Sequence, residues 1–483
     1  ATEHTRGGLM SSLVFLTEPT SAVVTERRLK LKSKLTMKQV MALPHQCDEM
    51  GARAERAYAR LGVRVRFFDV DGFGSGGYKL EIGTGGIIIC ATSSRGHAAG
   101  SWTLQQIMLQ HPQELPCGVF AGKPDVELRA CYLSLRCQKF KPAYLKSVMT
   151  DLTRLSYNAL IIDYHDTFPY KKEPCITGNV RYQSGQIADI RHAAKAHGLE
   201  LIPSLPVIGG LDYVAQLQPY ATLRGSAGAG VLDVKQPAAV KLLAGLIDEL
   251  VQAHDAKHVC LHVTTPMPDL AQHARALGEL TAGLVKRSVT PIVFIVGGVE
   301  PALLEQLADG TVVGVAGSAA VMEDVIATAH KRGLRTMPGI CVRSEADREW
   351  AHTPRPTLAA IAKYSKHLKE AIGACVWCPP SGAPASPNGP LGTPVSLLRG
   401  ARYTHLATLW LDLACVARVL WNTQGYSESA LLNAWPLLWY GVHDERYTTL
   451  QMLTGSDPCN PKQAADAAQD RKHVVKMVTE LKP

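Results

Sequence analysis

Strand-like and helix-like patterns alternate eight times between residues 128 and 378, and this alternation limits the possible folds most strongly. Short apolar runs rich in β-branched residues predict the strands, and longer runs with a helical period lie between them. Repeated βα units predict an α/β fold: a (β/α)8 TIM barrel is the leading interpretation, and a doubly wound open sheet is its main rival. The predicted strands are 130–135, 158–163, 199–204, 258–263, 291–296, 311–315, 335–340 and 373–378, and the predicted helices include 142–155, 185–197, 236–253, 270–286, 319–332 and 356–371.

A chain of 483 residues is too long for one ordinary domain. We predict a small α/β domain in residues 1–125, the barrel in 126–445, and a C-terminal tail with an amphipathic helix in 446–483. Within the first domain, the predicted elements are a half-exposed strand around 29–32, a helix over 46–61, a strand at 63–67, two strands around a glycine turn in 77–91, and a helix that begins at Thr103.

Residues 158–170 place polar side chains where a buried strand should end. The first part of this segment is apolar and β-branched, and Asp163, Tyr164, His165 and Asp166 follow it directly. In a TIM barrel, functional side chains gather at the C-terminal ends of the strands. We therefore expect these residues at the mouth of the barrel.

The same segment resembles the second barrel strand of family 20 glycoside hydrolases, the β-N-acetylhexosaminidases, and above all their hexosaminidase D-like members. The resemblance covers roughly residues 75–440, and residues 77–108 are similar to the non-catalytic domain that precedes many barrels of this family. It implies the barrel rather than the open sheet. It also implies an ancestral chemistry in which the substrate's acetamido group is the nucleophile, a Glu is the general acid, and the preceding Asp orients the acetamido group.

The positions of that Asp-Glu pair are where this sequence departs from the family. In the family the pair ends the fourth strand in a His-x-Gly-x-Asp-Glu motif; here His262 aligns with the His, and Pro266 and Met267 occupy the Asp and Glu positions. Neither Pro nor Met exchanges a proton, and a general acid is worth about 100- to 10,000-fold in rate. The sequence thus predicts a degenerate member with no catalytic residue assigned. Asp269, the carboxylate nearest to the motif, would have to shift three positions along the chain.

A polar set remains that the resemblance places at the barrel mouth. One interpretation is a remnant sugar pocket; the other, which we favour, is an inherited scaffold whose polar groups satisfy loop backbone. Further departures support the second interpretation: Gly210 stands where the family has a His, Ser134 replaces an Asp, and the fifth strand ends in apolar residues. The candidate residues are Arg129, Asp163, His165, Asp166, Asp212, His262 and Trp377.

We expect no metal and no cofactor. Cys375 and Cys378 have CxxC spacing, and a zinc site with Cys131 and Cys137 is the alternative to buried free thiols, but an extended strand turns the two CxxC side chains to opposite faces. The glycine-rich run 72–77 leads into a strand, not into a helix, which argues against a phosphate-binding loop.

The net charge of +9 favours anionic surroundings. An RNA or anionic-lipid partner at a basic run is one interpretation, and a solvated strand face is the commoner one. The run consists of Arg27, Arg28, Lys30, Lys32 and Lys34. No asparagine lies in a glycosylation sequon, and the chain begins with Ala1. We expect a mitochondrial location, with a secreted or lysosomal one as the alternative.

Three functions remain open from the sequence. The first is a non-catalytic subunit of a larger protein assembly, with contacts through the Pro-rich loop 379–394 or the tail 457–483. The second is an active hexosaminidase whose acid/base role has moved to Asp163, Asp166 or Asp212. The third is a carbohydrate-binding protein that uses Arg129, Asp163 and Trp377.

Overall fold

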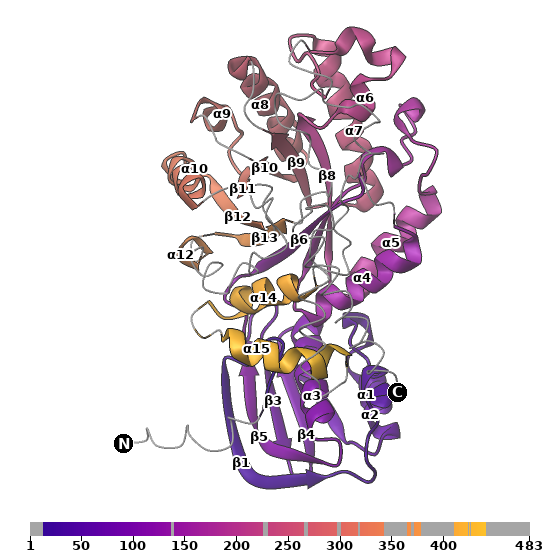
Figure 1. The fold of residues 1–483 in the computed structure, drawn as a ribbon, viewed down its shortest axis with the longest axis vertical. Helices are drawn as coiled ribbons and strands as arrows, with labels where there is room; N and C mark the ends of the chain where they lie inside the picture. Colours follow the sequence, from indigo (N-terminus) through magenta and orange to yellow (C-terminus); the bar gives the residue numbers. More distant parts are fainter. Residues whose placement is uncertain are drawn as a thin grey trace, which may run out of the picture.

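The computed structural model places eight parallel strands in a closed barrel beside a five-stranded sheet (Figure 1). The open-sheet alternative is therefore excluded, and the predicted TIM barrel with a small α/β domain is confirmed. The structure describes residues 13–136, 140–225, 230–264, 269–296, 301–316, 319–341, 365–368, 371–377, 410–423, 425 and 427–440.

The barrel strands agree with the predicted ones to within a few residues, except that the third extends further. They are β6 (Leu128–Ser134), β7 (Ala159–Asp163), β8 (Glu200–Ile208), β9 (His258–Thr264), β10 (Thr290–Val296), β11 (Val312–Ala316), β12 (Arg335–Cys341) and β13 (Gly373–Trp377). The helices between them include α4 (Pro142–Arg154), α5 (Ser184–Ala196), α6 (Asp212–Ala215), α7 (Pro237–His254), α8 (Leu270–Lys286), α9 (Pro301–Glu305), α10 (Ala319–Lys331) and α12 (Ser365–Leu368). Only α12 is described within the predicted helix 356–371. No helix in the described ranges is both long and apolar enough to cross a membrane.

Phe294 on β10 fills the middle of the barrel. Its ring is fully buried and stacks on that of Tyr132 from β6, with the ring centroids 6.3 Å apart. Gly314 on β11 and Gly339 on β12 lie against the same ring, and a Cβ at either position would overlap it. The interior is therefore packed by one large aromatic residue and two glycines that make room for it, as close-packed cores require.

The small domain is a mixed sheet with the strand order β1-β5-β3-β4-β2. Helix α3 (Ser94–Gln110) packs on one face of it, and apolar residues of both elements form the domain core. The strands are β1 (Ser21–Lys30), β2 (Val65–Asp69), β3 (Tyr78–Gly83), β4 (Gly86–Ala91) and β5 (Glu114–Gly122). Two short helices, α1 (Met37–Met41) and α2 (Ala52–Arg60), complete it.

Helix α3 begins at Ser94, nine residues before the predicted start at Thr103. The helix is capped by the Ser93 side chain, which accepts a hydrogen bond from the Gly96 amide at 3.2 Å. Two glycines in the first turns hid this start, because glycine lowers helix propensity by about 1 kcal/mol. A Cβ at Gly96 or Gly100 would overlap β3 and β4, so close packing on the sheet outweighs propensity.

Two other small-domain elements also differ from the sequence pattern. The predicted helix 46–61 is divided, because Gly51 has a φ of +76° between a short 3-10 turn (Cys47–Glu49) and α2. Strand β5, which the pattern did not indicate, pairs with both β1 and β3 and so lies inside the sheet.

Helix α14 (Trp410–Trp421) joins the two domains, and it lies between them with α15 (Glu428–Trp435) (Figure 1). All residues of α14 are buried. Its Arg418 donates to the Phe15 carbonyl at 2.6 Å and forms an ion pair with Glu18. Its last residue, Trp421, packs in the small-domain core. The C-terminal part of the chain is therefore built into the N-terminal domain.

The packing of the barrel interior gives a first prediction. Gly314→Ala should lower stability by about 1–3 kcal/mol, because the added methyl group overlaps the Phe294 ring. In a Phe294→Leu background the same change should cost less, since the smaller side chain leaves space. Chemical denaturation followed by circular dichroism measures both effects.

Gly245→Ala is the matched control. Gly245 lies within α7, and nothing would contact a Cβ there. This change should leave stability unchanged or raise it by up to about 1 kcal/mol. Equal losses at positions 245 and 314 would contradict the packing described for the barrel.

Candidate functional site

Asp163 is the centre of the polar cluster at the barrel mouth. It ends β7, and its carboxylate accepts hydrogen bonds from Ser134 Oγ at 3.1 Å, Tyr132 Oη at 3.4 Å and the His165 amide at 3.0 Å. The parallel pairing of β6 with β7 sets Ser134 beside Asp163, so the register delivers the first of these donors. The carboxylate is thus held in place by three donors, two from the neighbouring strand β6 and one from the loop that follows β7.

Burial determines the charge behaviour of this cluster. It raises the pKa of Asp163, and the nearby His165 and Arg136 oppose that shift. Burial also lowers the pKa of His262 on β9 to about 4, and the Arg136 guanidinium contributes to the decrease. His262 is therefore neutral at physiological pH. His262 thus offers no charged imidazole at this site.

His165 has a φ of +53°, which is unusual for a residue other than glycine. The Asp163 carboxylate that accepts from its amide helps to hold this conformation. The His165 ring lies 3.8 Å from the Tyr213 ring, centroid to centroid, and its Nδ1 is 3.3 Å from Asp166 Oδ1. The loop after β7 therefore contacts α6, the helix that follows β8, through two aromatic rings.

Arg136 and Asp212 form an ion pair across the same mouth. Arg136 Nη2 donates to Asp212 Oδ1 at 2.6 Å, and both side chains are partly exposed. The pair connects the loop after β6 with the start of α6. Sequence reasoning missed Arg136, although it follows a predicted strand by one residue, the same signal that identified Asp163.

Arg129 does not belong to this cluster, and its predicted place at the barrel mouth is wrong. It lies near the start of β6, where its amide donates to Asn158 Oδ1 and its guanidinium donates to the carbonyls of Ser156, Val126 and Glu127. Five residues along a strand correspond to about 16 Å, so Arg129 lies at the opposite end of the barrel from Ser134. The error has a simple cause: the side chain was placed from a motif, and strand polarity was not applied to it.

The structure therefore brings together five of the seven candidate residues: Asp163, His165, Asp166, Asp212 and His262. The backbone of Trp377 pairs with Tyr132, but its side chain is outside the described part. Pro266 and Met267, the positions aligned with the catalytic pair, also lie outside the described residues. Whether the five form a sugar pocket stays a prediction.

The other sequence candidates concern metals and the basic run. Among the residues that the structure describes, no three His, Cys, Asp or Glu side chains form a group that could hold a metal ion. Cys131 and Cys375 are buried, whereas Cys137 and Cys378 are outside the described ranges. Arg28 donates to the carbonyls of Thr25, Glu26 and Arg27 at a bulge of β1. Arg27, Lys30, Lys32 and Lys34 are exposed, and an anionic partner for them stays a prediction.

The burial of Asp163 predicts a pH-dependent effect of Asp163→Asn. An Asp whose pKa is raised by folding stabilises the protein fully below its unfolded pKa of about 3.8, and this contribution is lost as pH rises through the folded pKa. Asn carries no charge and avoids the loss. Relative to the wild type, Asp163→Asn should therefore be more favourable at pH 7 than at pH 4, as measured by thermal unfolding.

Asp309→Asn provides the comparison, because the Asp309 side chain is almost fully exposed. This variant should show the same small difference from the wild type at both pH values. An Asp163→Asn variant that is relatively more favourable at pH 4 would show that the carboxylate is stabilised in its ionised form.

Sequence comparison links the chain to known hexosaminidases. It is 27% identical over 137 residues to human Hexosaminidase D, which is 28% of this chain and 28% of that protein. It is 26% identical over 129 residues to bovine Hexosaminidase D, which is 26% of this chain and 37% of that protein. The matched segment thus spans well under two thirds of either relative. No protein-family model matches the chain.

Comparison of folds covers far more of the chain. A β-N-acetylhexosaminidase from Bacteroides fragilis superposes with a TM-score of 0.64 over 89% of this chain and 95% of that one, at 12% identity. The family 20 β-N-acetylhexosaminidase from Streptomyces coelicolor gives 0.63 over 88% and 95%, at 16% identity. The chain is therefore hexosaminidase-like: it has the two-domain fold of the family 20 β-N-acetylhexosaminidases and is a distant sequence relative of hexosaminidase D.

Proposed function

We propose that the protein is a non-catalytic relative of the family 20 hexosaminidases that serves as a subunit of a larger protein assembly. The observation that carries the proposal is the replacement of the catalytic Asp-Glu pair by Pro266 and Met267. Without the Glu, nothing protonates the leaving oxygen, and without the Asp, nothing orients the acetamido nucleophile.

The remaining carboxylates at the mouth support this proposal, because each already has a partner in the described structure. Asp163 accepts three hydrogen bonds in a buried setting, and Asp212 forms an ion pair with Arg136. A general acid must reach the leaving oxygen within hydrogen-bonding distance, and both carboxylates would have to give up some of these contacts to do so. A relocated acid/base is therefore the weaker alternative.

The outer face of the small-domain sheet supports the assembly part of the proposal. Val23 on β1 is 66% exposed and Phe68 on β2 is 50% exposed, and Ile88 and Val119 are partly exposed on the strands between them. Strand pairing sets Val23 beside Val119, and Glu81 lies between Val119 and Ile88. These four side chains form an apolar patch that Glu81 interrupts, and exposed apolar surface next to polar residues supports a protein–protein contact. We propose a mitochondrial location for this assembly, on the basis of the basic, sequon-free sequence alone.

The catalytic part is tested with a chromogenic N-acetylglucosaminide. We expect no turnover by the wild type above a blank, with an active family 20 enzyme assayed in parallel. The double change Pro266→Asp with Met267→Glu should restore little activity, because Gly210 and the apolar end of the fifth strand also depart from the family.

Wild-type turnover that Asp163→Asn abolishes and Asp309→Asn leaves intact would overturn the non-catalytic assignment. Saturable stabilisation by N-acetylglucosamine without turnover would instead favour the carbohydrate-binding alternative.

The assembly part predicts that the protein migrates on a native gel well above the position of a single 483-residue chain. The double variant Val23→Lys with Phe68→Lys should shift it toward the monomer position, because lysines at the patch oppose its burial against another subunit. Val180→Lys is the control, since Val180 is 62% exposed away from this sheet. Monomeric migration of the wild type in extracts of its own compartment would contradict the proposal.

A further inference from the structure

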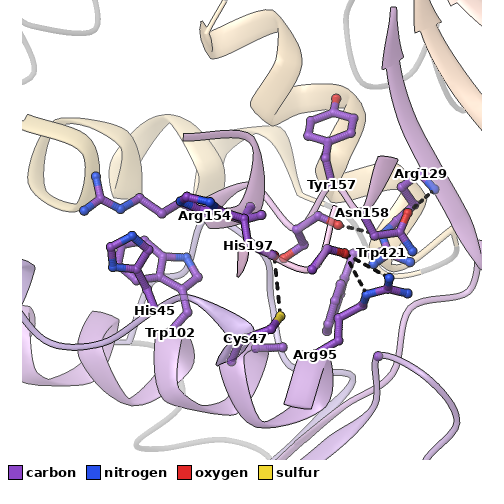
Figure 2. A pocket seen from close by; sticks show the side chains of 16 residues that line it. His45, Cys47, Arg95, Trp102, Arg129, Arg154, Tyr157, Asn158, His197 and Trp421 are labelled. Carbon is purple, nitrogen blue, oxygen red and sulfur yellow. Dashed lines mark hydrogen bonds between the residues drawn. The ribbon is translucent and has the colours of Figure 1, made fainter. Parts of the chain in front are cut away.

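A small cavity lies at the seam between the small domain and the N-terminal end of the barrel (Figure 2). Helix α3 contributes Arg95 and Trp102, the end of α4 contributes Arg154, and the loop before β8 contributes His197. The loop after α1 adds His45. The volume of about 40 Å³ can hold a small polyatomic group and is far too small for a sugar ring.

The lining of this cavity is cationic. Three arginines and two histidines are among its sixteen residues, and no Asp or Glu is. Arg154 has a carboxylate partner in Asp151, which is not part of the lining: the distance from Arg154 Nη1 to Asp151 Oδ1 is 3.5 Å. Among the described residues, Arg95 and Arg129 have no carboxylate partner. The hydrogen bonds that their guanidinium groups donate go to backbone carbonyls. Arg95 donates to the Gly198 carbonyl, and Arg129 donates to three carbonyls near the start of β6 and β7.

Three polar atoms at one end of the cavity are buried without a hydrogen-bond partner in the described structure: Trp102 Nε1, Arg154 Nε and His45 Nε2. The Trp102 side chain is 4% exposed, and the Arg154 guanidinium lies 5.7 Å from its ring centroid. A buried unpaired donor costs about 1–3 kcal/mol, more when it is charged. Trp102 Nε1 and Arg154 Nε are two such donors, and the neutral His45 ring, whose Nδ1 donates to the Leu43 carbonyl, turns its Nε2 into the same space as an acceptor. These atoms lining one small space indicate that the space is made for a polar guest.

The charges of the lining decide between a neutral guest and an anion. Burial lowers the pKa of Arg129 to about 9, and the neighbouring Arg95 adds to the decrease. Burial lowers that of His45 to about 4, with further contributions from Arg154 and His197. His45 is therefore neutral at physiological pH, whereas the Arg129 cation is destabilised by burial and by the nearby Arg95. Water would satisfy the open donors but would not offset this repulsion, whereas an anion would do both.

We propose that this cavity binds a small oxyanion with the chemistry of inorganic phosphate or sulfate, held by the Trp102 indole N–H and the Arg154 guanidinium. One ligand oxygen accepts from α3 of the small domain and another from α4 of the barrel, so the anion bridges the two domains. Cys47, whose Sγ donates to the His197 carbonyl at 3.4 Å, is part of the seam beside it (Figure 2).

Isothermal titration of the full-length protein with sulfate or phosphate, at an ionic strength kept constant with chloride, tests the proposal. The wild type should bind one anion saturably. Trp102→Phe removes the indole N–H but keeps most of the apolar ring, and Arg154→Gln removes the charge; each should weaken binding at least about tenfold. Arg332→Gln lowers the net charge equally at an exposed site remote from the seam and should bind like the wild type.

A site-specific signal separates this anion from general salt stabilisation. In a ¹⁵N correlation spectrum, the Trp102 indole resonance is the one missing from the spectrum of Trp102→Phe. As sulfate or phosphate is added to the wild type, this resonance should shift and give the same dissociation constant as the calorimetric titration. If Arg332→Gln weakened anion binding as much as Arg154→Gln does, binding would depend only on the net charge of the protein, and the proposal would be overturned. An unshifted Trp102 resonance at saturating sulfate and phosphate would assign the cavity to ordered water and also overturn it.

Discussion

Closure of the barrel through the pairing of β13 with β6 determines the positions of the polar cluster and of the cavity. All eight strands are parallel, so closure collects their C-terminal ends at one opening and their N-terminal ends at the other. Asp163 ends β7, Asp212 follows β8, and His262 lies near the C-terminal end of β9, so the three meet at the first opening. The second opening faces the small domain, and the cationic cavity lies there.

Burial organises the barrel mouth and at the same time limits its chemistry. The hydrogen bonds that position Asp163 come from side chains and backbone in a setting that raises its pKa, and the same setting lowers that of His262. An active glycosidase also uses burial to adjust pKa values, but it directs the adjusted group at a substrate atom. Here the adjusted groups face partners within the protein, an arrangement that supports the proposed non-catalytic role.

Most of the barrel was predictable because its strands are apolar runs and its helices have a clear period; the strands β6 to β13 lie close to the predicted ranges. The small domain was less predictable. Gly96 and Gly100 made α3 look non-helical, although the sheet requires them, and the pairing of β5 depends on partners distant in sequence. At the site, Asp163 followed from strand polarity. Arg129 was misplaced, and the cavity was missed, because it forms only when two domains meet.

The burial of Trp421 and Arg418 in the N-terminal part of the molecule has a consequence for the order of folding. Trp421 belongs to the small-domain core, and Arg418 contacts Phe15, 403 positions earlier in the chain. Contacts at such separations are slow to form, and a growing chain leaves the ribosome from its N-terminus. The domain synthesised first therefore completes its core only after all eight barrel strands have emerged, and until then the core residues that Trp421 covers stay uncovered.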